Sequence, residues 1–94
     1  MAATEMSHEP DAHRYVLRAD GAIASVLEYA EQNGAVSFHR TVTVPSHRNR
    51  GYAAQLVEFA VDDVESRGAG PIRPACWFVA DWFEQHPERA ALLG

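Results

Sequence analysis

Lysine is absent from this 94-residue sequence, and cysteine occurs once, as Cys76. A single cysteine cannot form an internal disulfide framework, and such a low cysteine content fits a reducing compartment. No apolar run approaches the ~18 residues that a membrane-spanning helix needs. The amino-terminal segment also lacks the basic start and apolar stretch of a secretory signal. We therefore expect a small cytoplasmic protein with no membrane partner.

The charge of the chain is acidic overall but unevenly distributed. Asp and Glu number 13 and arginine 8, so the net charge is −5, which argues against a nucleic-acid partner. Residues 32–57, however, contain no Asp or Glu, and they carry Arg40, Arg48 and Arg50. A basic window inside an acidic protein favours a site for an anionic ligand. The alternative is a chance cluster on a solvated face.

The residue patterns predict one α+β domain over residues 14–94, preceded by a flexible tail over residues 1–13. A hydrophobic fraction of 47% is typical of a globular chain, and this length allows only one domain. The Asp20-Gly21 and Asn33-Gly34 dipeptides favour tight hairpin turns. Three strands in an antiparallel meander are therefore predicted, at residues 14–19, 22–30 and 35–44.

On the third predicted strand, apolar and polar residues alternate, so that each set should occupy one face. The alternation places Val36, Phe38, Arg40, Val42 and Val44 on one face and Ser37, His39, Thr41 and Thr43 on the other.

The second half of the chain predicts a β–α–β unit and a final helix. Apolar residues spaced by three or four predict a helix over residues 53–67, followed by a short strand at 72–76 and a second helix at 77–86. The two strands that flank the long helix should be parallel neighbours. We expect the aromatic residues of the last helix to belong to the core, with the alternative that one of them lines a ligand channel. These residues are Trp77, Phe78, Trp82 and Phe83.

A basic loop joins the third strand to the long helix, with the sequence Pro45-Ser46-His47-Arg48-Asn49-Arg50-Gly51-Tyr52. The first turn of a helix presents backbone N–H groups without internal partners and carries partial positive charge. A glycine at this junction allows a ligand to approach the backbone closely. The loop therefore predicts a phosphate-binding cradle, with an ordinary surface turn as the alternative.

The pattern Arg48-x-x-Gly51-x-Ala53 at a strand-to-helix junction resembles the pyrophosphate-binding signature of the GNAT superfamily of N-acetyltransferases. Other segments resemble a small, single-domain GNAT-like subfamily in the same order. These segments are Asp20-Gly21, Thr41-Val42-Thr43-Val44-Pro45, Pro74-Ala75-Cys76-Trp77-Phe78-Val79 and His86-Pro87-Glu88. The resemblance implies a GNAT-like mixed sheet whose last two strands splay apart.

The resemblance also implies acetyl-coenzyme A as the cofactor. The backbone of residues 42–44 would pair with the pantetheine arm, the loop would hold the pyrophosphate, and the acetyl end would lie near Cys76. The implied coenzyme-binding residues are Val42, Thr43, Val44, Arg48, Asn49, Arg50, Gly51, Tyr52, Ala53, Ala54 and Phe78.

The subfamily usually has His-Thr-Glu-Val on the third strand, where this chain reads Arg40-Thr41-Val42-Thr43, and three of the departures from the subfamily pattern bear on the chemistry. Val42 stands where a glutamate is usual, Asn49 where a glycine is usual, and Trp82 where a tyrosine is usual. Cys76 and His39 are then the candidate catalytic residues, because a thiolate can accept an acetyl group and an imidazole can act as a base. Each also has an ordinary structural alternative, as a packed thiol and a solvated strand histidine. No residue cluster has the spacing of metal ligands.

Three functional hypotheses follow. The first is an acetyltransferase that uses acetyl-coenzyme A and acts on a protein or small amine acceptor. The second is a non-catalytic acyl-coenzyme A-binding module, acting as a sensor or carrier, and the third is a protein-interaction domain that keeps only the fold. We expect a monomer or a weak homodimer. Since lysine is absent, self-acetylation of a lysine side chain is excluded.

Overall fold

A computed structural model of the protein describes residues 3–94, with Met1 and Ala2 outside the described residues. Its elements are β1 (Thr4–Glu9), β2 (Arg14–Ala19), β3 (Ala22–Gln32), β4 (Ala35–Thr43), α1 (Tyr52–Ser66), β5 (Ile72–Pro74) and α2 (Trp77–Gln85), with 3₁₀ turns at Pro10–Ala12, Pro45–His47 and Pro87–Leu92. The strands form one sheet in the order β1-β2-β3-β4-β5. The first four strands pair antiparallel, and β4 and β5 pair in parallel. The predicted α+β class, meander and β–α–β unit are confirmed.

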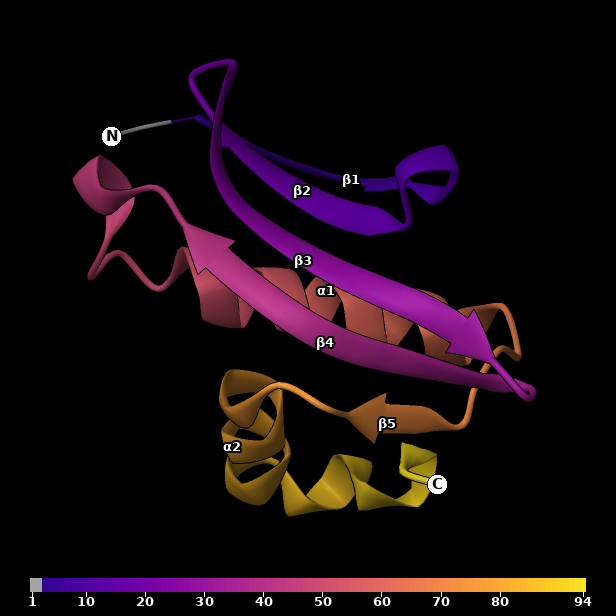
Figure 1. The fold of residues 1–94 in the computed structure, drawn as a ribbon. Helices are drawn as coiled ribbons and strands as arrows, with labels where there is room; N and C mark the ends of the chain where they lie inside the picture. Colours follow the sequence, from indigo (N-terminus) through magenta and orange to yellow (C-terminus); the bar gives the residue numbers. More distant parts are fainter. Residues whose placement is uncertain (1–2) are drawn as a thin grey trace.

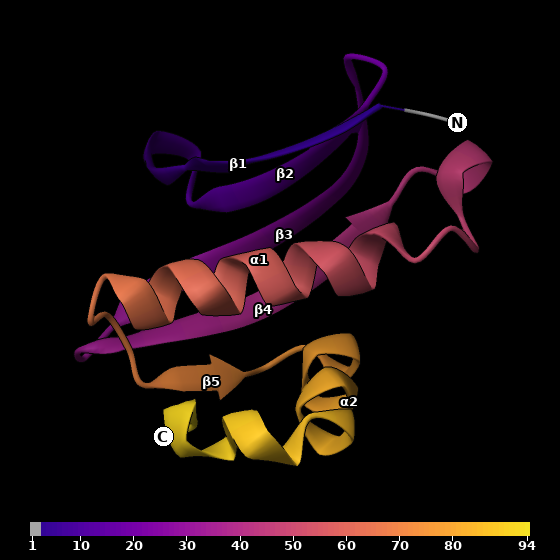
Figure 2. The ribbon, with the colours of Figure 1, turned by 180° about the vertical axis from the view of Figure 1, so that it is seen from behind.

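The core lies between the sheet and α1, which runs behind β3 and β4 in Figure 1 and in front of them in Figure 2. The buried stripe of α1 has the predicted helical spacing and comprises Leu56, Val57, Ala60, Val61 and Val64. From the sheet, Tyr15, Leu17, Leu27 and Phe38 are fully buried against it. Burial of each such side chain contributes roughly 1.5–3 kcal/mol, so this single layer of contacts holds the helix on the sheet.

Both predicted hairpin turns are present. Asp20 and Gly21 have φ values of 51° and 84°, and Asn33 and Gly34 have φ values of 51° and 77°. Two successive positive φ values are what a tight two-residue hairpin turn requires.

A bulge interrupts the pairing of β3 with β4. Tyr29 lies opposite Phe38, but Glu28 lies opposite Arg40, so His39 is an extra residue in β4. An extra residue of this kind shifts the alternation of side chains by one position along the rest of the strand.

The bulge reverses the two faces of β4 beyond His39. Thr41 and Thr43 line the same pocket as the first turn of α1, whereas Val42 and Val44 are 39% and 36% exposed. The predicted alternation is therefore wrong for this half of the strand. The single bulged residue places two threonines on the helix side of the sheet and two valines on its open side.

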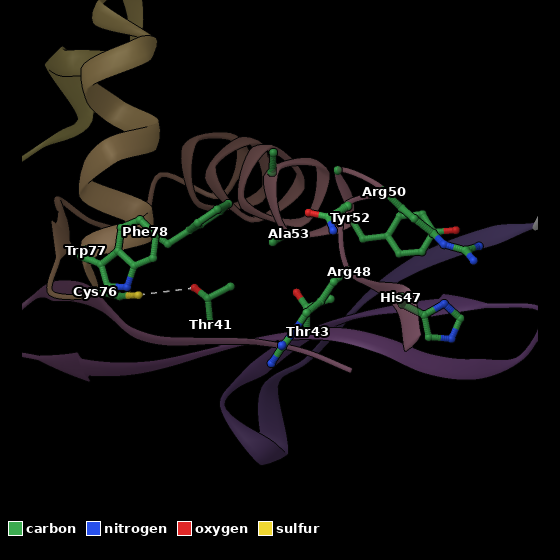
Figure 3. A pocket seen from close by; sticks show the side chains of 13 residues that line it. Thr41, Thr43, His47, Arg48, Arg50, Tyr52, Ala53, Cys76, Trp77 and Phe78 are labelled. Atoms are coloured by element: carbon green, nitrogen blue, oxygen red, sulfur yellow. Dashed lines mark hydrogen bonds between the residues drawn. The ribbon is translucent and has the colours of Figure 1, made fainter. Parts of the chain in front are cut away.

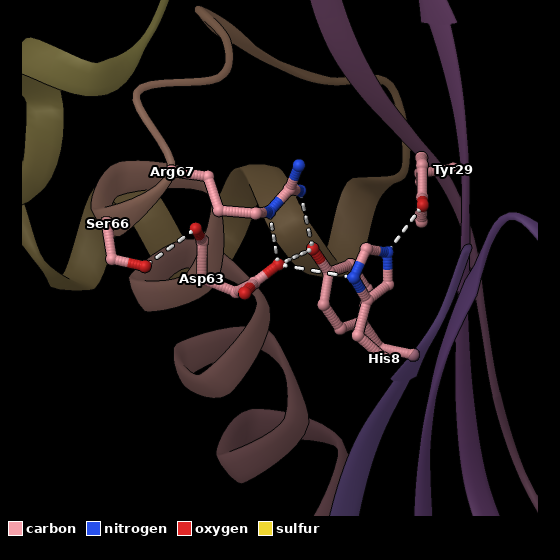
Figure 4. A network of polar contacts seen from close by, with 6 residues as sticks. His8, Tyr29, Asp63, Ser66 and Arg67 are labelled. Carbon is pink, nitrogen blue, oxygen red and sulfur yellow. Dashed lines mark hydrogen bonds and ion pairs between the residues drawn. The ribbon is translucent and has the colours of Figure 1, made fainter.

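The flexible tail predicted for residues 1–13 is wrong for the described residues, and its prediction for Met1 and Ala2 falls outside them. Residues 4–9 form the edge strand β1, which pairs along its full length with β2. His8 stacks on Tyr15 with ring centroids 4.3 Å apart, and its Nε2 lies 2.6 Å from the Tyr29 hydroxyl. Its Nδ1 lies 3.4 Å from Asp63 Oδ2 on α1 (Figure 4). The stacking and the two polar contacts of His8 join β1 to β2, β3 and α1.

Across residues 3–94, no helix combines the length and the apolar character that crossing a lipid bilayer requires.

Candidate functional site

A pocket of about 570 Å³ opens between the end of β4, the start of α1 and the start of α2. Its volume falls in the range of small-molecule and cofactor sites. The pocket is lined by Thr41, Thr43, His47, Arg48, Asn49, Arg50, Gly51, Tyr52, Ala53, Ala54, Cys76, Trp77 and Phe78. In Figure 3 the Cys76, Trp77 and Phe78 side chains lie at one end of it, and His47 and Arg50 lie at the other.

The pocket exists because β5 leaves β4 early. Their parallel pairing ends at Phe38 opposite Pro74, and the Cys76 N–H still donates to the Phe38 carbonyl at 3.0 Å. Beyond that point the chain turns into α2. The remainder of β4 therefore presents an edge to which β5 does not pair.

The backbone of Thr41 and Thr43 faces this open edge. The Val44 N–H donates to the Ala24 carbonyl of β3 at 2.9 Å, and backbone direction alternates along a strand. Val44 and Val42 therefore direct their backbone groups toward β3, and the two threonines direct theirs toward the pocket. An extended ligand can pair with such an edge as an added strand does. The residues suited to that pairing are the threonines rather than the valines.

The amino-terminus of α1 forms the basic end of the pocket. Gly51 is the N-cap residue with a φ of 75°, and no side chain caps the helix. The first turn also contains no acidic residue, and Arg48 and Arg50 are exposed beside it. Free N–H groups, the helix dipole and two guanidinium groups all favour an anion such as a phosphate.

Asn49 adopts the backbone conformation that a glycine would adopt most easily. Its φ is 63°, in the left-handed region that asparagine tolerates better than most residues. Asn49 can therefore hold this turn of the loop at the position where the subfamily pattern has a glycine.

The amino-terminus of α2 borders the opposite end of the same pocket. Cys76 is its N-cap residue, and no acidic residue lies in the first turn. The positive ends of both helix dipoles therefore converge on one cavity. Within residues 3–94, no Asp or Glu lines this pocket, so negative charge inside it is favoured throughout.

The Cys76 thiol lies at the junction of β4 and α2. Its Sγ is 3.6 Å from the Thr41 hydroxyl. Partial burial acts to raise the pKa of Cys76, but the Thr41 hydroxyl and the backbone N–H groups of Phe78 and Val79 outweigh it, so the pKa is lowered. A lowered pKa increases the thiolate fraction at neutral pH, and the thiolate is the nucleophilic form.

His47 packs beside Tyr52, with ring centroids 6.0 Å apart. Its Nδ1 is buried without a hydrogen-bond partner among residues 3–94. Buried polar atoms normally have partners, so this nitrogen is an exception beside the basic end of the pocket.

The structure brings most of the predicted site residues together. Thr43, the loop residues 48–54, Cys76 and Phe78 all line the pocket, whereas Val42, Val44 and His39 do not. His39 is exposed as the bulged residue of β4, and its imidazole is not part of the cavity.

Three lining residues were not among the predicted site residues, namely Thr41, His47 and Trp77. His47 lies in the basic window of residues 32–57, which indicates an anion site. Thr41 is turned toward the pocket by the β4 bulge, which the strand's own sequence does not predict. Trp77 was expected in the core, and this expectation is wrong because its side chain is 78% exposed. It occupies the first position of α2 at the mouth of the pocket, while Trp82, one turn and a residue further on, is buried as predicted.

Among the described residues, no group of three or more His, Cys, Asp or Glu side chains is placed to hold a metal ion. The arrangement instead suits an elongated anionic ligand, with phosphate groups at the α1 end and an extended arm along β4. A thiol and two aromatic side chains lie at the far end. The fold and this site together define an α+β protein whose pocket, between a strand edge and two helix amino-termini, suits an extended anionic ligand.

Comparison with known proteins gives the family. A model of the GCN5-related N-acetyltransferase family matches residues 14–92, and the chain belongs to this family. Among curated proteins, none matches the chain significantly. The resemblance found from the sequence motifs is thus confirmed at the level of the family and the fold.

Proposed function

We propose that this protein binds acetyl-coenzyme A in the pocket and transfers the acetyl group to an amine. Proteins of this family generally use acetyl-coenzyme A. The observation that carries the proposal is the convergence of two uncapped helix amino-termini and an unpaired β4 edge on one cavity. Each of these three features suits one part of the coenzyme.

The coenzyme would lie along the length of the pocket. Its pyrophosphate would accept hydrogen bonds from the N–H groups that follow Gly51 and would pair with Arg48 and Arg50. The pantetheine arm would pair with the backbone of Thr41 and Thr43 in the manner of an added strand. The thioester would then lie beside Cys76.

The acetyl group would pass through Cys76. The Cys76 thiolate would attack the thioester carbonyl, so that a carbon–sulfur bond to Cys76 would form while the bond from the carbonyl carbon to the coenzyme sulfur would break. A neutral amine then attacks the acetyl-cysteine, gains the acetyl group and releases the Cys76 thiolate, and the amine proton passes to water. The N–H groups at the start of α2 would stabilise the negative charge that develops on the carbonyl oxygen.

A non-catalytic acyl-coenzyme A-binding module is the second candidate. It is favoured by one observation, namely that no carboxylate of the described residues and no His39 imidazole lies in the pocket. The His47 imidazole lines the pocket at the end opposite Cys76, so a general base for an amine beside Cys76 would have to come from the acceptor or from solvent.

Titration calorimetry with coenzyme A and intact-protein mass spectrometry after incubation with acetyl-coenzyme A test both candidates. Binding together with an acetyl adduct on Cys76 that a panel of amines discharges would support the transferase. Binding with neither an acetyl adduct nor acetyl transfer to any amine would select the binding module. Absence of binding would overturn both and leave an interaction domain.

A further inference from the structure

Trp77 is placed where a ligand, rather than the core, would cover it. Its side chain is 78% exposed, and it packs edge-to-face on Phe78 with ring centroids 5.8 Å apart. It also lines the pocket directly beside Cys76 (Figure 3). Exposed tryptophans next to a functional pocket commonly anchor a binding partner, because they bury a large area when covered.

The outer face of α2 continues from Trp77 as an acidic stripe. Asp81 follows it by four residues and Glu84 by seven, so all three side chains share one helical face, and both acids are exposed. Residues 77–88 contain three acidic residues and no arginine. The pocket therefore has a basic end at α1 and an acidic approach at α2.

The acids of this stripe are free to bind a partner. Within residues 3–94, neither Asp81 nor Glu84 takes part in an ion pair, and Asp81 accepts a hydrogen bond only from Gln85. The neighbouring cation Arg89 is instead paired with Asp62 and Glu65 on α1. In the part of the chain that the structure describes, no cation pairs with these carboxylates.

We propose that Trp77, Asp81 and Glu84 form the docking surface for the acceptor, and that the acceptor is a basic peptide segment. This inference rests on the proposed function and names its substrate class. A cationic side chain or the acceptor amine would lie over the Trp77 ring, and flanking cationic side chains would pair with Asp81 and Glu84. Seven residues of helix rise by about 10 Å, which is the span of about three extended residues. An open, linear, acidic face of this length fits a peptide chain.

The binding test uses the indole N–H signals of the two tryptophans in NMR spectra, with Trp77→Phe to assign them. The probe is a decapeptide with one lysine flanked by arginines, and the matched peptide has glutamates in place of those arginines. We expect the basic peptide to shift the Trp77 signal and leave the Trp82 signal in place, since Trp82 is buried. The Asp81→Asn/Glu84→Gln double variant should weaken this binding about fivefold to tenfold. An unmoved Trp77 signal, an equal response to both peptides, or an unaffected double variant would overturn the proposal.

A second measurement separates this inference from the proposed function. The double variant should bind coenzyme A with unchanged affinity in calorimetry, because Asp81 and Glu84 lie outside the pocket. In a transfer assay it should raise the KM for the basic peptide and leave kcat unchanged. If wild-type protein fails to bind coenzyme A, the proposed function fails, while the NMR titration still decides whether the surface binds the peptide. A free polyamine that shifts the Trp77 signal as strongly as the peptide would overturn the peptide assignment.

Discussion

The Thr41 hydroxyl and the Cys76 thiol lie 3.6 Å apart, although 35 residues separate them in the chain. The contact joins β4, just beyond its bulge, to the N-cap residue of α2. It exists only because the bulged residue His39 shifts the strand by one position and turns Thr41 toward the pocket. The pKa of Cys76, the one cysteine in the sequence, therefore depends on the bulge at His39 in β4.

Replacing Thr41 with valine should make Cys76 less acidic. The hydroxyl helps to lower the pKa of the thiol, so its loss leaves burial as a larger influence and raises the pKa. A net hydrogen-bond contribution of ~1 kcal/mol predicts alkylation at neutral pH about threefold to tenfold slower. The pH profile of iodoacetamide alkylation, followed by mass spectrometry, should move to higher pH.

The matched control for this change is Thr41→Ser, which keeps the hydroxyl and removes only the methyl group. Its alkylation profile should stay close to that of the wild type. If the valine and serine variants behave alike, the hydroxyl does not act on the thiol.

Replacing Gly51 with alanine should lower both stability and coenzyme A affinity. A φ of 75° is strained for alanine, and a left-handed residue costs roughly 1–2 kcal/mol. The added Cβ would also stand at the N-cap, where the proposed pyrophosphate binds, and we expect an affinity loss of about tenfold, or ~1.4 kcal/mol. Chemical denaturation and calorimetry measure the two effects.

Gly34→Ala separates strain from ligand contact. Gly34 has a φ of 77° with open space around it, and it lies in the β3–β4 hairpin outside the pocket. Its substitution should destabilise the protein by a similar amount and leave coenzyme A affinity unchanged. Equal affinity losses in both variants would mean that Gly51 acts only through stability.

Local patterns predicted most of the fold and the basic end of the site. The two hairpin turns, the buried stripe of α1 and the loop of residues 48–54 depend on short-range chemistry, which the sequence displays directly. Which side chains of β4 face the helix cannot be predicted in this way, because a bulge depends on the register with the neighbouring strand rather than on the strand's own residues. The bulge changes the site, because Thr41 lines the pocket where Val42 was predicted.

The two arginines of the loop should contribute to affinity mainly through charge. Both are exposed, and exposed ion pairs each contribute ~0.2–1 kcal/mol. The Arg48→Gln/Arg50→Gln variant should therefore lose about fivefold to tenfold in coenzyme A affinity at low salt, and clearly less near ~0.5 M salt. Calorimetry at the two ionic strengths measures this difference. The control, Arg73→Gln, removes an exposed arginine outside the pocket and should leave the coenzyme A affinity unchanged at both ionic strengths. If the double variant lost the same affinity at both ionic strengths, an electrostatic role would be contradicted.

The edge strand β1 could not be predicted from its own residues. Residues 4–9 are polar and have no clear alternation, so their local preference for a strand is weak. They are held by tertiary contacts: backbone pairing with β2 and the contacts of His8 with Tyr15, Tyr29 and Asp63. These partners are spread over three other elements, and their meeting depends on the completed sheet.

The His8 network should make stability depend on pH. Burial lowers the pKa of His8 below its ordinary value of 6.5, even though Asp63 acts to raise it. The unfolded chain therefore takes up a proton first as the pH falls, and the free energy of unfolding decreases as the pH drops below about 6.5. The pKa of Asp63 is lowered as well: burial acts to raise it, but hydrogen bonds from Tyr15 and Arg67 outweigh that effect. A further loss should follow below about pH 3.8, where the unfolded carboxyl takes up its proton.

Urea denaturation at about pH 7.5 and pH 5.5 tests this dependence. His8→Gln should remove the part of the pH dependence in this window that His8 causes, while the other four histidines stay in place. Asp63→Asn should destabilise the protein at both pH values by about 1–3 kcal/mol, because Arg67 loses its charged partner and the Tyr15 hydroxyl its carboxylate acceptor. If the wild type and His8→Gln lose equal stability on acidification, the pH dependence arises elsewhere, and the role of His8 is limited to packing β1 against Tyr15.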